Sequence, residues 1–519
     1  MDAISQNRLV LLSRNIFTAT GDTPFDGFIA IEGNKIAAVG SREEAGRWTD
    51  GAQVVDLGEK LVTPGFGDVH TFFSGWVLRS LGVDFAGIHS DAEGIETLRQ
   101  YSQTRPAGAP LFGHCWDADN FEITDDTLLD RVFPDRPVVV FTFDRDRCWM
   151  NQAAKDRYGF TPEECYAEKI WRMIRDYLAE PEMPEKYLEY CRMLNERGIT
   201  TIKEMTFDDY YGFADVMEQL EKEHRLTVRV SMMSQPVGRG IDIPHGHAMK
   251  ERFQGEFVSF SGYNRMTDRG IPSFLGELIE PYKSRPDITC LVPVEWELIE
   301  AETLEADRNG FRYSLHCQGD GAVRHTVDLY DRCQKNNGKL VNRHAITDLE
   351  YTNPSDLERF GAMGGITEVY AQIQSLDKRQ DVLDMIDRQL GGDRGKNYWN
   401  RRKMWDSGIC VTCGTDLPLL IPDIPEAVSC GCGGCFADGL TYNEQNMLTV
   451  AEMLTAWTKN GQYSCYNEDR LGTLEPGKLA DIAVIDQDLF HVPLNEAKNA
   501  KVCMTISDGR IVYDTTRKE

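Results

Sequence analysis

The sequence predicts an α/β protein: a (β/α)8 TIM barrel with a small β-sandwich domain formed by both chain termini. Three observations support this fold. Short apolar segments alternate with helical segments along the middle of the chain, both ends are rich in strands, and 519 residues suffice for one barrel with additions.

Strand-like alternation marks the first and last segments of the chain. It covers residues 7–19, 26–41, 52–66, 478–488 and 501–514, and residues 31–40, "IEGNKIAAVG", have the glycine-marked turn of a hairpin. Because an isolated hairpin is only marginally stable, we expect the two ends to bury their apolar faces together. The prediction is a composite domain of residues 1–63 and 468–519.

Residues 64–467 are predicted to form the barrel. Candidate strands alternate with helices, and they cover residues 136–144, 198–205, 226–233, 311–318, 344–351, 364–372 and 408–416. Residues 75–190 hold more helix and loop than a barrel needs, which predicts an inserted subdomain or lid. In such a barrel the catalytic side chains lie at the carboxyl ends of the strands.

Polar residues stand where these strands end. His70 closes "PGFGDVH", with Phe72 two residues later on the same face, and further along come Lys203–Glu204, His316, Asp348 and Asp416. Histidines and carboxylates at neighbouring strand ends are what a metal-assisted hydrolase requires, since the metal acidifies a water and a carboxylate takes its proton.

Several motifs resemble the amidohydrolase superfamily, in particular its YtcJ-like amidohydrolase family 3. They are "PGFGDVH" (64–70), "DRCWMN" (146–151), "GITTIKE" (198–204), "LHCQGDGAV" (315–323), "RHAITD" (343–348), "CGTDLP" (413–418) and "RLGTLEPGKLADIAVID" (470–486). The ligand set departs from the family pattern, because Phe72, Arg147 and Asp348 stand where that family usually has histidine.

The resemblance assigns roles to individual residues. Candidate catalytic residues are Asp416 as general base, His316, Asp348 and Arg147. Candidate metal ligands are His70, His316, Asp416, Glu204 and Asp348, of which Glu204 is favoured over its neighbour. Candidate substrate-binding residues are Phe72, Arg147, Trp116, Lys203 and Asp320. One divalent metal (zinc, manganese or iron) is the expected cofactor, and a metal-free site is the alternative.

Two further groups of possible ligands are weaker candidates. His245 and His247 form an HxH pair in a stretch that reads as a polar loop, where a metal site is not expected. Five cysteines have spacings that can hold zinc or an iron–sulfur cluster, but buried free thiols explain them better: Cys410, Cys413, Cys430, Cys432 and Cys435.

Composition limits the possible partners. The net charge of −27 disfavours binding to nucleic acid or anionic lipid. Neither a signal peptide nor a membrane-spanning stretch is recognisable, and the scattered cysteines are typical of a cytoplasmic protein. We expect a small-molecule substrate, and the resemblance implies a homodimer.

Three functions follow from these features. The first is hydrolysis of an amide, cyclic amide or related C–N bond by metal-activated water. The second is a metal-independent acid–base enzyme on the same barrel that catalyses ring opening, hydration or isomerisation of an activated carbonyl compound. The third, ranked lowest, is a small-molecule binding protein without turnover.

Overall fold

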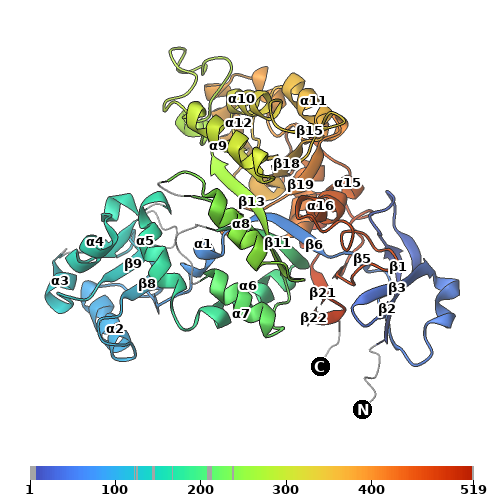
Figure 1. Ribbon diagram of the computed structural model, residues 1–519, viewed down its shortest axis with the longest axis horizontal. Helices are drawn as coiled ribbons and strands as arrows, with labels where there is room; N and C mark the ends of the chain where they lie inside the picture. The colour runs from blue at the N-terminus through green and yellow to red at the C-terminus, as the bar shows by residue number, and fades with distance from the viewer. Residues whose placement is uncertain are drawn as a thin grey trace.

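The computed structural model describes residues 8–121, 123, 125, 127–142, 147–165, 167–206, 213–236 and 239–516. Residues 143–146, which include parts of two segments singled out in the sequence, therefore lie outside the described part. The molecule has a central barrel, the composite terminal sheet on one side and the inserted segment on the other (Figure 1).

Eight parallel strands form the barrel, in the order β6, β11, β12, β13, β14, β17, β18 and β19. Their bounds are Phe66–Thr71, Ile199–Thr206, Arg229–Ser234, Val258–Met266, Arg312–Cys317, Ala345–Asp348, Ile366–Val369 and Cys410–Cys413. Phe72 N donates a hydrogen bond of 2.8 Å to Leu417 O between the first and last strands, which brings the ring almost to closure. The predicted TIM barrel is confirmed.

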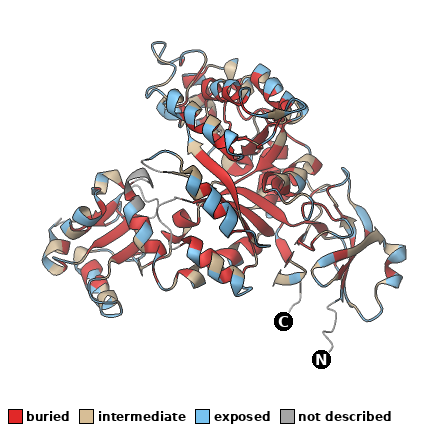
Figure 2. Ribbon diagram, in the orientation of Figure 1, coloured by how far each residue is buried: buried red, intermediate tan, exposed pale blue. Residues whose placement is uncertain are grey.

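Helices cover the outside of the barrel. The main ones are α6 (Met183–Asn195), α7 (Phe213–Lys222), α8 (Ile243–Arg252), α9 (Trp296–Arg308), α10 (Asp320–Tyr330), α11 (Pro354–Ala362), α12 (Arg379–Gln389), α13 (Arg401–Asp406), α14 (Ile424–Gly433), α15 (Val450–Thr455) and α16 (Gly461–Ser464). The strands are buried almost throughout, as expected for a parallel sheet covered on both faces (Figure 2).

Two strand predictions need correction. Residues 138–142 do form a strand, β9, but it belongs to the inserted segment and not to the barrel. The barrel instead uses β13, which the sequence pattern missed because its small and polar residues, "VSFSGYNRM", interrupt the apolar run.

Both chain termini build one hydrogen-bonded sheet, in the order β22-β21-β20-β5-β1-β2-β3, with β4 paired to β1. The strands are β1 (Arg8–Ile16), β2 (Phe25–Glu32), β3 (Lys35–Ser41), β4 (Gln53–Asp56), β5 (Leu61–Pro64), β20 (Ile482–Ile485), β21 (Val502–Ser507) and β22 (Arg510–Asp514). The predicted hairpin is the β2–β3 pair. Ladder β5–β20 joins the two ends of the chain.

The inserted segment has a small sheet of its own, in the order β10-β9-β8-β7. Its strands are β7 (Val83–Asp84), β8 (Leu111–Trp116), β9 (Val138–Thr142) and β10 (Cys148–Met150), and its helices include α1 (Phe73–Val77), α2 (Asp91–Gln103), α3 (Leu128–Val132), α4 (Gln152–Tyr158) and α5 (Ala167–Leu178). Part of this segment has a separate apolar core around Leu98, Val140 and Trp149. None of the described helices has the length and apolar character needed to cross a membrane.

Candidate active site

His70, at the end of β6, lies between two carboxylates at the barrel mouth. Its Nδ1 is 3.6 Å from Glu368 Oε2, and its Nε2 is 3.8 Å from Asp416 Oδ1. The His70 side chain is only 4% exposed, whereas that of Asp416 is 34% exposed. Asp416 is therefore the more accessible of the two side chains.

A fully buried ion pair supports His70 from inside the barrel. Lys203 Nζ on β11 contacts Glu368 Oε1 on β18, and both side chains are inaccessible to solvent. Burial alone would raise the pKa of Glu368, but the charges of Lys203, His70 and Arg312 lower it to about 2. Glu368 is thus a permanent anion facing His70.

Asp68 fixes the ends of the first and last barrel strands relative to each other. Its carboxylate accepts hydrogen bonds from Thr415 N (3.1 Å), from Thr415 Oγ1 (2.5 Å) and from His70 N (3.2 Å). Burial raises the pKa of Asp68 to about 7. Because Thr415 precedes Asp416, these bonds hold Asp416 beside His70.

His316 and Asp348 form a second charged pair at the ends of β14 and β17. His316 Nε2 is 3.0 Å from Asp348 Oδ2, which also accepts a hydrogen bond of 2.5 Å from Gln318 Nε2. Burial lowers the pKa of His316, but the hydrogen bond and charge of Asp348, with the charges of Asp268 and Asp416, raise it to about 9. His316 is therefore an imidazolium at neutral pH.

Polar atoms with no hydrogen-bond partner among the described residues lie in this region. They include Tyr370 Oη and His316 Nδ1, both buried. The ring of Tyr370 is 5.7 Å from that of His70, and its hydroxyl is close enough to Asp416 and Asp348 for their charges to raise its pKa further, after burial. A buried polar atom without a partner is costly, so these atoms point to a bound molecule or water.

The two aspartates of the site have unusual backbone conformations. The φ angle is +80° at Asp348 and +51° at Asp416, both in the left-handed region. Such a conformation costs free energy for a residue with a Cβ, and it is often found where a side chain must be aimed at a ligand.

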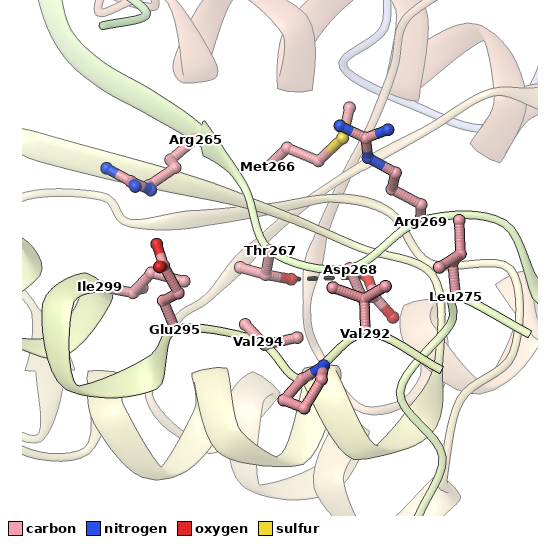
Figure 3. Close-up of a pocket in the computed structure, with 11 residues that line it drawn as sticks. Arg265, Met266, Thr267, Asp268, Arg269, Leu275, Val292, Val294, Glu295 and Ile299 are labelled. Atoms are coloured by element: carbon pink, nitrogen blue, oxygen red, sulfur yellow. Dashed lines mark hydrogen bonds between the residues drawn. The ribbon is translucent and has the colours of Figure 1, made fainter. Parts of the chain in front are cut away.

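A cavity of about 380 Å³ opens at the end of β13 (Figure 3). Thr267 Oγ1 donates a hydrogen bond of 2.6 Å to His316 O, and the next residue, Asp268, lines the cavity. The other lining residues are mostly apolar, with two arginines: Arg265, Met266, Arg269, Leu275, Val292, Pro293, Val294, Glu295 and Ile299. Asp268 accepts backbone hydrogen bonds from Glu277, Gln318 and Gly319.

Not every residue predicted from the sequence reaches this site. Of the neighbours on β11, it is Lys203 that faces the barrel interior, whereas Glu204 accepts hydrogen bonds from Thr71 Oγ1 (2.7 Å) and Phe73 N (2.5 Å). Burial raises the pKa of Glu204 to about 8. The preference for Glu204 over Lys203 is not supported, because strand alternation turns it away from His70.

Arg147 and Trp116 belong to the inserted segment. Arg147 is about half exposed and forms an ion pair of 2.8 Å with Asp119, and Trp116 Nε1 donates to Phe121 O within the apolar core of that segment. Neither has a described contact with His70, His316 or Asp416. The roles of Arg147 and Trp116 in substrate binding, and of Arg147 in catalysis, stay predictions.

Phe72 and Asp320 occupy supporting positions. The ring of Phe72 stacks edge-on against His70 at 5.4 Å, so it lies at the site as an apolar wall. Asp320 opens α10, and its Oδ1 accepts a hydrogen bond of 2.9 Å from Ile279 N. That bond fixes a loop, and within the described part of the chain no hydrogen bond or ion pair joins Asp320 to His70, His316 or Asp416.

The structure also gives the positions of the weaker metal-ligand candidates. His245 and His247 lie in helix α8 and not in a loop, because Asp242 caps the helix and Pro244 occupies its first turn. Cys410, Cys413, Cys430, Cys432 and Cys435 are free thiols. Within the described part of the chain, no three of these five cysteines converge as metal ligands.

Sequence reasoning missed several members of the site, namely Asp68, Asp268, Glu368 and Tyr370. Glu368 carried a usable signal, since a single carboxylate inside the apolar strand "ITEV" must be paired if it is buried. Asp68 shares a strand face with His70, two residues away. Asp268 follows β13, the strand that was not recognised.

The donors at the barrel mouth do not fit a three-ligand metal site. His70 and Asp416 could supply two metal ligands. Phe72 has no ligand atom, and the carboxylate of Asp348 is already engaged by His316 and Gln318. Among the described residues, the groups of three converging donors lie elsewhere, at Asp84, His114 and Cys115 and at Asp307, Cys333 and His344.

Comparison with known proteins gives the family. The model of the amidohydrolase family matches residues 53–513. The chain belongs to the amidohydrolase family. It is an enzyme of the hydrolase class within the amidohydrolase superfamily, as the sequence motifs indicated.

Three relatives illustrate the match. The Bacillus subtilis protein YtcJ, which carries amidohydrolase in its name, is 23% identical over 89% of this chain and 90% of its own. The N-substituted formamide deformylase of Arthrobacter pascens is 21% identical over 98% of each chain. A crystal structure described as an uncharacterized metal-dependent hydrolase from Pyrococcus horikoshii superposes with a TM-score of 0.72 at 20% identity, covering 94% of this chain and 99% of the other.

Proposed function

We propose that this protein hydrolyses a C–N bond of a small organic molecule, an amide or cyclic amide, by acid–base chemistry of its own side chains. The observation that carries the proposal is the pairing at the barrel mouth: an accessible carboxylate beside a histidine, and a buried imidazolium opposite. The named activity of the formamide deformylase, together with family membership, supports a C–N bond as the target.

The residues divide into a base side and an acid side. Asp416, with His70 behind it, removes a proton from water, and the resulting hydroxide attacks the carbonyl carbon. The oxyanion that forms accepts hydrogen bonds from Tyr370 Oη and from the His316 imidazolium. The C–N bond then breaks, and the proton taken from water leaves on the departing nitrogen.

The cavity at the end of β13 fits the rest of the substrate. Its walls are mainly apolar, and Thr267 in its lining donates a hydrogen bond to the backbone oxygen of His316. A substrate with an apolar body in this cavity would present its carbonyl group to His316. The small hollow lined by Asp348 and Tyr370 has no room for such a group, so the β13 side is the proposed entrance.

The test uses purified full-length protein, assayed on N-formyl amines and cyclic amides before and after dialysis against a chelator, with elemental analysis of both samples. We expect activity in the dialysed protein. Asp416→Asn and His316→Asn should each lower kcat/KM by about 10²–10⁴-fold. His491→Asn, at an exposed site outside the barrel mouth, is the matched control.

Two outcomes decide between the proposal and its alternatives. Activity that disappears on dialysis and returns with one equivalent of zinc, manganese or iron would contradict the metal-independent mechanism and favour hydrolysis by metal-activated water. Turnover of an activated carbonyl compound without C–N cleavage would favour ring opening, hydration or isomerisation instead. A further expectation is that kcat/KM falls as pH rises through about 9, because His316 then loses its proton.

A further inference from the structure

The inserted segment contains a cluster of three different donor groups on strands that do not belong to the barrel. Asp84 on β7 and the neighbours His114 and Cys115 on β8 place a carboxylate oxygen, an imidazole nitrogen and a thiol sulfur within 4.8 Å of one another. None of these side chains takes part in the proposed hydrolysis.

A break in the strand brings two consecutive residues to the same point. In a regular strand, neighbouring side chains point to opposite faces. Here the β8–β9 ladder changes register between Gly113 and Trp116, and Cys115 has a φ angle of +59°. As a result Cys115 Sγ lies 3.3 Å from His114 Nδ1, and the strain at Cys115 is associated with this convergence.

The geometry distinguishes a metal site from a catalytic triad. In a triad the two imidazole nitrogens bind different partners, one the nucleophile and the other the acid. Here both neighbours approach the same atom: His114 Nδ1 is 3.3 Å from Cys115 Sγ and 3.9 Å from Asp84 Oδ1. Three donors gathered around one point are the arrangement of a chelate.

The separations agree with tetrahedral zinc. Bond lengths of about 2.3 Å to sulfur and about 2.0 Å to nitrogen at a tetrahedral angle place these two atoms about 3.5 Å apart. The observed nitrogen–sulfur distance is 3.3 Å. The Asp84 side chain is 62% exposed, its Oδ1 accepts a hydrogen bond of 2.8 Å from Ala86 N, and the same atom lies 3.9 Å from His114 Nδ1.

We propose that Asp84, His114 and Cys115 form a binding site for one borderline-soft divalent cation such as Zn²⁺, with the fourth position open to water. Thiolate and imidazole select zinc or cobalt over magnesium and calcium. Burial lowers the pKa of His114, which keeps the imidazole neutral and able to ligate, whereas the Cys115 thiol gives up its proton only when the cation arrives.

The other group of three donors among the described residues, Asp307, Cys333 and His344, is fully buried and provides a contrast. His344 Nε2 lies 3.0 Å from Asp307 Oδ1, and His344 Nδ1 accepts a hydrogen bond of 3.0 Å from Tyr313 N. Both ring nitrogens of His344 are therefore engaged, and the carboxylate of Asp307 also binds Asn342 and Gln334. That group holds the fold together and offers no free donor atom.

The experiment is titration of the chelator-dialysed full-length protein with Co²⁺, read as a near-ultraviolet thiolate-to-cobalt charge-transfer band, followed by displacement with Zn²⁺. We expect a band that saturates at one equivalent. Cys115→Ser should abolish it, and Asp84→Asn should weaken Co²⁺ affinity at least about tenfold. Cys290→Ser, at another partly exposed thiol outside the cluster, should leave the band unchanged.

Each outcome bears on the proposal. No band at excess Co²⁺, or a band that survives Cys115→Ser, would overturn it. Asp84→Asn guards against misfolding as an explanation, because the side chain is exposed and its replacement leaves the packing intact. The readout does not depend on hydrolytic activity, so failure here leaves the proposed function untouched.

Discussion

At the scale of single residues, the most consequential pair is Lys203 and Glu368. Both are fully buried, and they join opposite sides of the barrel under His70. A buried ion pair adds little net stability, because desolvation offsets the attraction between its charges. Removing one partner is nevertheless costly, since the other charge would then be buried without compensation.

Lys203→Met is therefore expected to lower the free energy of unfolding by about 3–5 kcal/mol, because the Glu368 anion loses its partner. Urea denaturation at pH 7 measures this. The double variant Lys203→Met, Glu368→Gln should recover most of the loss, since neither charge of the pair remains. A loss below about 1 kcal/mol in the single variant would contradict the assigned pairing.

At the scale of the element, a shift of one residue along strand β11 decides which polar side chain faces the interior of the barrel. Lys203 and Glu204 are adjacent and both buried, but they face opposite sides of the strand. The sequence alone identifies the strand and the alternation, and it does not say which of two neighbouring polar residues points inward. That choice depends on how β11 pairs with β6 and β12.

The variant Glu204→Gln tests whether the Glu204 side chain faces away from the active site or into it. With a pKa of about 8, Glu204 is mostly protonated at pH 7, and an amide can replace the acid in its bonds to Thr71 and Phe73. We expect activity within about threefold of wild type and a stability change below about 0.5 kcal/mol at pH 7. A loss of activity of a hundredfold or more would show that Glu204 acts at the site after all.

The same limit explains the other differences between sequence and structure. The strand ends carrying His70, His316, Asp348 and Asp416 could be predicted, because apolar runs and their polar ends are local features. The position of Arg147 could not be predicted, because nothing local in "DRCWMN" indicates that its segment folds around a separate core. Strand β13 was not recognised from the sequence, because its polar residues face other parts of the barrel and not solvent.

At the scale of the whole molecule, several buried groups titrate in the same direction. Burial raises the pKa values of Asp68 to about 7 and of Glu204 and Glu350 to about 8, and that of His316 is raised to about 9 by Asp348 despite burial. Each group binds its proton more tightly in the folded state than in the unfolded state. Raising the pH therefore favours unfolding.

We expect the melting temperature to fall between pH 6 and 9 and to level off only above about pH 10, where these groups are deprotonated in both states. Differential scanning calorimetry across this range tests the expectation. Glu204→Gln should make the decline shallower, because it removes one of the titrating groups. A melting temperature that rises over this interval would show that these acids are not held protonated by burial.

The terminal sheet has a consequence for how the protein is made. Strand β5 pairs with β20, and Thr63 bonds to Ala483, 420 positions further along the chain. At about 5–20 residues per second, a ribosome needs about 20–85 s to supply that partner. During this interval strand β5 of the nascent chain lacks its hydrogen-bonding partner. We expect a chaperone that covers this strand edge until translation ends to raise the yield of native protein.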